Sequence, residues 1–202
     1  MSTRARVRVA AGALIVLLVG SAPPAAGQGP ATGAWLDHSP PVNWNTPGAR
    51  LPAPRPVEAE AETRARCAGT LRRVTMREDR ALARAGWRLV GPYQHFSGTS
   101  VVTGSSGWDG MCRPLGYQVF VFVDGILAGT LSPVLMDSRT DGAESRLFLF
   151  QATELSAEFL RYREADPLCC PSRVSRVTYR IERTGKTPIL VPTSASTELI
   201  AR

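Results

Sequence analysis

The chain has 202 residues, of which 44% are apolar and 20% charged, with a net charge of +7 and four cysteines. The length fits one domain of ordinary size, and the apolar fraction excludes a wholly disordered chain. Four cysteines are too few for a disulfide-dense miniprotein, the class that folds with almost no hydrophobic core.

Residues 1–27 have the pattern of a secretory signal peptide. A start with three arginines precedes the apolar run 10–20, which is too short to span a bilayer that needs about 20 residues. The small residues at 24–27 then offer a peptidase site, and we place the cleavage after Gly27. An uncleaved membrane anchor is the alternative interpretation.

Cleavage at this position would change what the charge implies. It removes three arginines and leaves 21 basic against 17 acidic residues, a net charge of +4. The basic balance then no longer argues for a nucleic-acid partner. The first cysteine is Cys67, so no cysteine for lipid attachment lies near the cleavage site. We expect a periplasmic or secreted protein with no transmembrane segment after cleavage.

Residues 28–57 form a proline-rich segment. Nine of the 16 prolines lie between Pro23 and Pro56, which excludes a helix or a central strand there. The segment nevertheless contains Trp35 and Trp44, and a tryptophan buries a large apolar area wherever it can. We therefore expect an N-terminal strap that docks its tryptophans on the domain that follows. A disordered linker is the alternative.

The most regular helical signal lies at 76–85. Thr75 and Glu78 have the spacing of a capping box, in which a hydroxyl and a carboxylate bind each other's backbone N–H groups. Gly86 follows as a C-terminal stop signal. These residues predict a helix over 76–85.

Basic residues are dense around this helix. Four arginines recur at helical spacing and share one face: Arg73, Arg77, Arg80 and Arg84. They are candidates for an anion-binding surface. A solvated helix face is the simpler interpretation, because charge runs usually keep a face wet.

From Trp87 onward, β-branched and aromatic residues alternate with polar ones. Asp124-Gly125 is a two-residue hairpin signal between strands expected at 119–123 and 126–131, and both strands are apolar enough to be central and covered on both faces. Further strands are expected at 146–151, 155–163, 176–182 and 189–191.

These elements predict an α+β fold, in which an antiparallel sheet of about five to seven strands carries one or two short helices and disulfide cross-links. We expect a single domain over 58–193 and a frayed tail over 194–202.

The four cysteines are expected to be oxidised in an exported protein. Cys169 and Cys170 are adjacent, and neighbouring residues do not meet the usual Cα separation of ~4.4–6.8 Å without distortion. We therefore expect two long-range disulfides, each with one member of this pair, and disfavour a bridge between Cys67 and Cys112. Zinc binding is the rival interpretation. The spacings lack a CxxC pair and only two histidines could assist, His38 and His95, so no metal site is expected.

Catalytic signals are weak. A nucleophilic pair of Cys112 with His95 would need a free thiol, and the chain has no GxSxG, phosphate-binding or dinucleotide motif. The segment 137–142 begins like a calcium loop, but Arg139 occupies the third ligand position and Phe148 stands where the bidentate glutamate belongs. We interpret it as a polar turn. No cofactor and no enzymatic activity are expected.

Two stretches carry a family resemblance. The segment DGMCRP at 109–114, continued by 117–143, and the segment AEFLRYREADPLCCPSR at 157–173 resemble the LppP/LprE-like family of bacterial exported proteins, many of them lipoproteins. The similarity extends over roughly 35–192. It implies an extracytoplasmic protein of no established biochemical function and carries over no catalytic residue. This chain departs from the lipoprotein members because it lacks a lipobox cysteine.

Three functions remain open at this point. The first is a non-catalytic envelope or secreted module that binds an envelope protein or a glycan, and this is our expectation, with the chain as a monomer. The second is a hydrolase with an unrecognised site, and the third is an anion binder that uses the four arginines.

Overall fold

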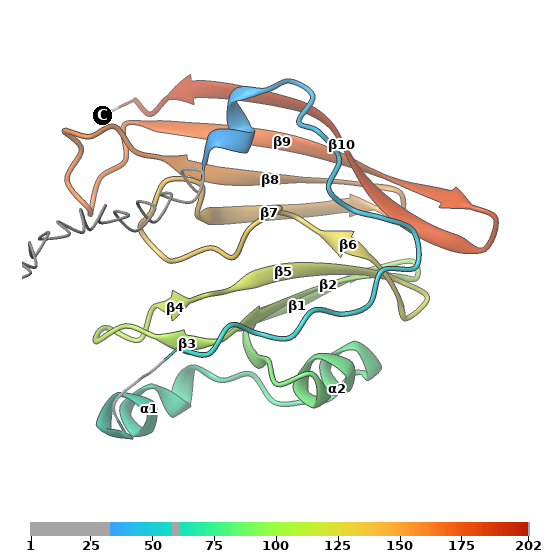
Figure 1. The fold of residues 1–202 in the computed structure, drawn as a ribbon, viewed down its shortest axis with the longest axis horizontal. Helices are drawn as coiled ribbons and strands as arrows, with labels where there is room; N and C mark the ends of the chain where they lie inside the picture. Colours follow the sequence, from blue (N-terminus) through green and yellow to red (C-terminus); the bar gives the residue numbers. More distant parts are fainter. Residues whose placement is uncertain (1–32, 58–60, 202) are drawn as a thin grey trace, which may run out of the picture.

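The protein is described by a computed structural model that covers residues 33–57 and 61–201. Figure 1 shows three layers, with one four-stranded sheet above a second and two short helices beneath the second sheet. The predicted signal peptide, residues 1–27, lies outside the described residues.

Every sheet is antiparallel. The lower sheet has the order β1-β2-β5-β6 and contains β1 (Arg88–Phe96), β2 (Thr99–Ser105), β5 (Gln118–Val123) and β6 (Ile126–Thr130). The upper sheet has the order β10-β9-β8-β7 and contains β7 (Glu144–Gln151), β8 (Glu154–Arg161), β9 (Arg173–Thr184) and β10 (Thr187–Leu199). A separate hairpin pairs β3 (Gly107–Trp108) with β4 (Pro114–Leu115).

The mostly antiparallel fold with two short helices agrees with the expectation, but the predicted single sheet of five to seven strands is wrong. The strands divide into sheets of four, four and two. The reason is visible in β5, which is buried along its whole length. Val119 and Val121 pack in the core shared with the upper sheet, whereas Phe120 packs in the core shared with the helices. A strand that is apolar on both faces needs a layer on each side.

The helical layer contains α1 (Ala61–Cys67), α2 (Arg77–Arg84) and a short 3₁₀ turn between them, η2 (Ala68–Thr70). The helix predicted at 76–85 is confirmed within one residue at each end. Gly86, with φ of +97°, ends it. The N–H of Gly86 donates to Ala83 O at 3.0 Å and the N–H of Trp87 to Leu82 O at 3.0 Å, which is a Schellman ending.

The residue that caps α2 differs from the expected one. Asp79, and not Glu78, accepts the N–H groups of Met76 at 3.0 Å and Thr75 at 3.1 Å. Arg72 also donates two hydrogen bonds of 2.7 Å to this buried carboxylate. Burial alone would raise the pKa of Asp79, but the hydrogen bonds from Arg72 and from the two backbone groups outweigh it and hold this pKa at about 2.

The hairpin between β5 and β6 is confirmed. Asp124 and Gly125 have φ of +50° and +77°, as a two-residue turn of the type that matches strand twist requires. The expectation that both strands are central is wrong for the second one. β6 ends the lower sheet, and its Ile126 is 46% exposed.

The N-terminal strap, residues 33–57, packs along the two sheets. Its first turn is η1 (Ala34–Asp37), and Trp35 makes edge-to-face contacts at 5.0 Å with both Trp44 and Phe159 of β8. Asp37 accepts a hydrogen bond of 2.8 Å from the buried Arg161. The tryptophans are therefore docked on the domain.

The strap also closes one side of the molecule. The side-chain amide of Asn45 donates to Thr130 O of β6 and to Leu190 O of β10, both at 3.1 Å, and its oxygen accepts the N–H of Thr130 at 2.8 Å. Trp44 adds a hydrogen bond from its Nε1 to Thr130 O at 3.1 Å. These contacts join β6, an edge strand of the lower sheet, to β10, an edge strand of the upper sheet.

The frayed tail expected over 194–202 is wrong as far as Leu199. β10 continues to Leu199, which pairs with Arg173 at the start of β9. The long partner strand supplies hydrogen-bonding groups along this whole stretch, so the tail is ordered by pairing despite its polar sequence.

Candidate functional site

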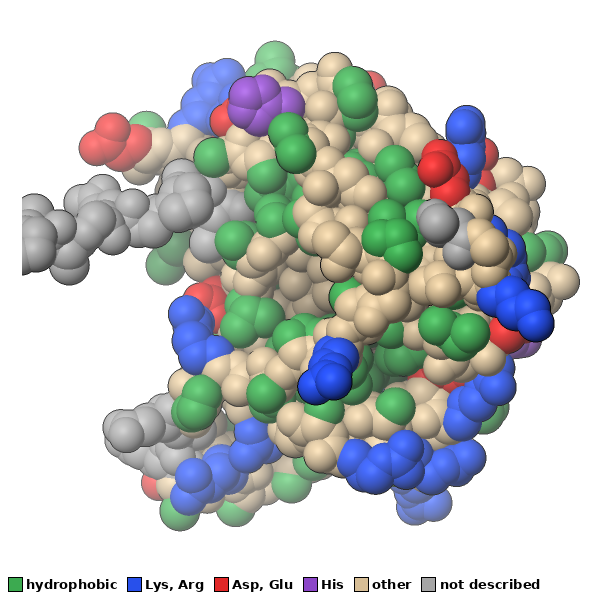
Figure 2. All heavy atoms as spheres, turned by 45° about the vertical axis from the view of Figure 1, so that its right-hand side comes forward, with side chains coloured by type: hydrophobic (Ala, Val, Ile, Leu, Met, Phe, Trp, Pro, Cys, Tyr) green, Lys and Arg blue, Asp and Glu red, His purple; other side chains and the backbone are tan. Residues whose placement is uncertain are grey.

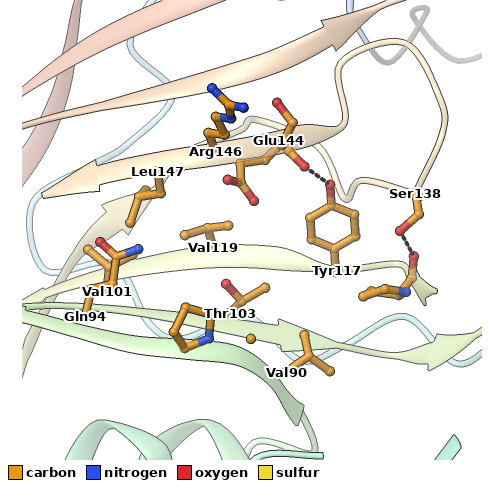
Figure 3. A pocket seen from close by; sticks show the side chains of 14 residues that line it. Val90, Gln94, Val101, Thr103, Tyr117, Val119, Ser138, Glu144, Arg146 and Leu147 are labelled. Atoms are coloured by element: carbon orange, nitrogen blue, oxygen red, sulfur yellow. Dashed lines mark hydrogen bonds between the residues drawn. The ribbon is translucent and has the colours of Figure 1, made fainter. Parts of the chain in front are cut away.

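A cleft of about 360 Å³ lies between the two four-stranded sheets (Figure 3). It opens at the β1 and β7 edges, whereas the Asn45 contacts lie at the β6 and β10 edges. Its walls are mainly apolar and come from β1, β2, β5 and β7. Six apolar residues line it, namely Val90, Pro92, Val101, Pro114, Val119 and Leu147. Its polar groups come from Gln94, Thr103, Tyr117, Ser138, Glu144, Ser145 and Arg146. The combination of apolar walls with a few polar groups is typical of small-molecule sites.

Strand pairing builds the floor of the cleft. Thr103 of β2 lies between Val90 of β1 and Val119 of β5, and the three form a row across the lower sheet. Val101, two residues from Thr103, points to the same face because side chains alternate along a strand. The floor is therefore made of short β-branched side chains, which leave room above them.

Irregular pairing opens the cleft at the edges of both sheets. In β1 the register shifts between Val90 and Gln94, and Gly91, with φ of +65°, and Pro92 lie in this interruption. In β7 the register shifts between Glu144 and Arg146. Both strands are edges of their sheets, and bulges there bend the strand and redirect side chains. The two bulged edges face each other across the cleft.

Glu144 is the one acid among the cleft-lining residues. Figure 3 shows its carboxyl pointing down toward Val119, whereas Arg146 extends the opposite way. Within residues 33–57 and 61–201, no group donates a hydrogen bond to this carboxyl or forms an ion pair with it. Burial raises the pKa of the Glu144 carboxyl from 4.5 to about 7.

Tyr117 holds the strand that carries this carboxyl. Its hydroxyl donates to the backbone carbonyl of Glu144 at 3.0 Å, and the tyrosine is only 4% exposed. Burial raises the pKa of Tyr117, so the hydroxyl stays protonated near neutral pH. The turn beside it is fixed by Asp137, which accepts the N–H of Gly116 at 2.6 Å, and by Ser138, which donates to Pro114 O at 2.8 Å.

A second polar cluster lies on the opposite face of the lower sheet, beside α2. The Tyr93 hydroxyl is 2.7 Å from Ser100 Oγ and donates to Glu78 at 3.2 Å, and His95 Nδ1 is 3.0 Å from the same serine oxygen. Ser100 is 2% exposed and both neighbours already occupy its hydroxyl. The cluster ties β1, β2 and α2 together and leaves the serine out of reach of a substrate.

The four arginines predicted to share a helix face are all exposed, but they do not share one helix. Arg77, Arg80 and Arg84 lie on α2, whereas Arg73 lies in the preceding loop. Arg77 pairs with Glu78 at 2.8 Å, and Arg80 donates to Thr75 O at 2.8 Å. In Figure 2 the basic side chains gather along the lower edge of the molecule, where Figure 1 places the helical layer.

The predicted disulfide pairing is wrong. Cys67 pairs with Cys112, with Cα atoms 5.1 Å apart, and Cys169 pairs with its neighbour Cys170. The topology explains the first bridge, because α1 packs against β3 and so places Cys67 beside the β3–β4 loop that carries Cys112. The adjacent cysteines lie in the connection between β8 and β9 of the upper sheet.

The remaining sequence candidates are also placed. Cys112 is in a disulfide, so it is not a free nucleophile for His95, and His38 is exposed in the strap. The segment 137–142 is a turn between β6 and β7, as expected. In the described part of the chain, no three histidine, cysteine, aspartate or glutamate side chains gather as a metal site would require. In the same part, no helix has the length and apolarity to cross a membrane.

Sequence reasoning did not single out Glu144 or Tyr117. Each stands two residues before a predicted strand, where an acid and a tyrosine are unremarkable in a single sequence. Nothing in the local pattern shows which face of the strand the acid occupies.

Comparison with known proteins gives one match. The family model described as LppP/LprE lipoprotein matches residues 93–184, from the middle of β1 to the end of β9. This confirms the family resemblance over that segment, whereas the strap and β10 lie outside it. Searches of curated proteins and of solved structures gave no significant match.

Proposed function

Residues 93–184 match the family model of LppP/LprE lipoproteins, and from this premise we propose that the chain is an exported, non-catalytic protein of the bacterial envelope that binds a small ligand in the cleft between its sheets. The observation that carries the proposal is the cleft itself. It combines about 360 Å³ of space, apolar walls and a carboxyl without a partner in the described chain.

The binding role is better supported than a catalytic one. The cleft contains one carboxyl, and the hydroxyls of Tyr117 and Ser138 already donate to backbone carbonyls. A general acid–base pair or an activated nucleophile needs two such groups within hydrogen-bond reach of each other. The buried Ser100 cluster has that proximity but no access.

The arginine surface supports an anion-binding function less well. Two of its four members, Arg77 and Arg80, already have partners on their own segment. Exposed guanidinium groups with no cavity between them gain little from a single anion in water. An envelope protein or glycan as partner, and a monomeric state, stay predictions.

Location is tested by cell fractionation of the full chain. We expect the protein in the envelope fraction or the culture medium, separated from a cytoplasmic marker enzyme. Recovery with that marker would contradict export and would also remove the reason to expect oxidised cysteines.

Binding is tested with N-phenyl-1-naphthylamine, an uncharged probe whose fluorescence rises in apolar surroundings. We expect saturable binding that Thr103→Phe weakens at least about tenfold, or ~1.4 kcal/mol, because the new ring occupies the floor of the cleft. Thr46→Phe, on the exposed strap, adds the same ring away from the cleft and is the matched control.

The two variants are compared by circular dichroism and melting temperature, so that loss of fold is separated from loss of the site. Probe binding that is non-saturable, or equal in the two folded variants, would count against the cleft as the binding site.

A further inference from the structure

We propose that the ligand of the cleft carries a protonated amine that pairs with Glu144 and an apolar body that lies over the β-branched floor. This inference rests on the proposed binding function and names the chemical class of its ligand.

The first argument is the state of the Glu144 carboxyl. It points into the cleft, and the described chain offers it no donor. A desolvated carboxylate without a partner is unfavourable, and it is stabilised most by a charge-assisted hydrogen bond from a cation. A ligand ammonium supplies the charge and the donors that the protein itself does not.

The second argument is the charge distribution around this end of the cleft. Asp137 also acts on Tyr117, as Glu144 does, but Arg55 lies 3.9 Å from the Asp137 carboxylate and offsets its charge. Arg146 lines the cleft but extends away from Glu144, with a side chain 73% exposed and an ion pair of 4.0 Å to Glu158. Among the cleft-lining residues, Glu144 is therefore the charged side chain that points into the cleft, and its ionised form favours a cation and disfavours a ligand carboxylate.

The third argument is the shape of the apolar part. Val90, Thr103 and Val119 form a flat row, and Leu147 covers them from β7. A cleft of about 360 Å³ with such walls fits a short alkyl or aryl body and excludes a folded macromolecule. The proposed class is a small amine with one apolar substituent.

The test uses three competitors that share an octyl-type alkyl group and differ in charge, namely n-octylamine, n-octanol and n-octanoate. Each is titrated at pH 8 into the full-length protein with N-phenyl-1-naphthylamine bound, and loss of fluorescence measures displacement of the fluorescent probe. We expect octylamine to displace the probe at about a tenfold lower concentration than octanol, and octanoate to be the weakest.

Glu144→Gln keeps the size of the side chain and removes the charge. In this variant we expect the amine and the alcohol to compete within about twofold of each other, because a neutral amide makes no charge-assisted pair. Glu182→Gln, on an exposed part of β9, makes the same change in net charge away from the cleft and should keep the wild-type preference.

The preference should also depend on pH in a defined direction. Besides Glu144, the charged or titratable groups on this side of the described chain are Tyr117, Asp137 with its partner Arg55, Tyr179 and Arg146. Burial raises the pKa of both tyrosines, so neither loses its proton below pH 8. Octylamine should therefore bind more tightly as the pH rises from 5 to 8 and Glu144 ionises, whereas octanol should not.

The outcomes separate the two proposals. If the fluorescent probe does not bind saturably, the binding function fails and this inference fails with it. If the probe binds but octylamine competes no better than octanol, or keeps its preference in Glu144→Gln, the amine class is wrong and the binding function stands. Loss of the preference in Glu182→Gln would also overturn the inference, because the effect would then come from net charge alone.

Discussion

At the scale of single residues, Glu144 costs the folded protein stability. Burial raises the pKa of its carboxyl to about 7 in the folded chain, against an ordinary 4.5. The folded state therefore holds this proton more tightly than the unfolded state. As the pH rises from about 4.5 through 7, stability falls, and above about 7 the whole penalty is present. A partly buried carboxyl that carries such a cost and points into a cleft is a candidate for function.

The corresponding prediction concerns Glu144→Gln in the absence of ligand. We expect this variant to raise the free energy of unfolding by on the order of 1 kcal/mol at pH 8, less than the full shift would give because the side chain is half-buried. At pH 4 the variant and the wild type should unfold alike. Urea denaturation at the two pH values measures the difference.

Glu182→Gln serves again as the control, with no expected change at either pH because the side chain is exposed. An equal gain at pH 4 and pH 8 would show that the glutamine is stabilising for a reason other than the charge of Glu144.

At the scale of secondary-structure elements, the two sheets meet differently at their two sides. β6 and β10 are joined through Asn45 of the strap, whereas β1 and β7 diverge at their bulges and leave the cleft. The strap therefore sets the spacing of the sheets from the closed side. Because the strap holds the sheets together at β6 and β10, the sheets can stay apart at β1 and β7, where the cleft lies.

Asn45→Ala tests this arrangement. The substitution leaves the N–H of Thr130 and the carbonyl of Leu190 without this partner in a partly buried place, and we expect it to lower the free energy of unfolding by about 2 kcal/mol. Urea denaturation measures the loss. Asn43→Ala is the matched control, because Asn43 is exposed and accepts one local hydrogen bond, from the N–H of Asn45. A loss within about 0.5 kcal/mol in both variants would mean that the side-chain amide does not hold the sheets together.

At the scale of the whole molecule, turns and helix ends could be predicted from the sequence, whereas the division of the strands between two sheets could not. The Asp124-Gly125 hairpin and the helix ended by Gly86 depend on neighbouring residues, and both are confirmed. Which strands share a sheet depends on contacts far apart in sequence, so the division into two layers could not be read from periodicity. The position of Glu144 has the same origin, because the cleft exists only where β7 faces the bulge of β1.

The cysteines show the same limit. The usual Cα separation in a disulfide argues against a bridge between the adjacent Cys169 and Cys170. If these two cysteines each pair elsewhere, Cys67 and Cys112 cannot pair with each other, so the sequence disfavours that bridge too. The bridge between Cys67 and Cys112 follows from the packing of α1 beneath the β3–β4 hairpin, which the sequence did not predict because the short helix over 61–67 was itself not predicted. The first disulfide therefore joins the helical layer to the strands above it.

This placement predicts unequal effects of removing the two bridges. The bridge between Cys67 and Cys112 spans 45 residues and constrains the unfolded chain, so the double variant Cys67→Ser with Cys112→Ser should lose about 2–4 kcal/mol of unfolding free energy. The bridge between Cys169 and Cys170 closes almost no loop, and its double serine variant should change stability by less than about 0.5 kcal/mol. Guanidinium denaturation without reductant measures both, and thiol titration of the unfolded wild type should find no free cysteine. Equal and large losses in the two variants would contradict this pairing. They would indicate that Cys67 and Cys112 are each bridged to one of Cys169 and Cys170, because each double variant would then break two long-range disulfides.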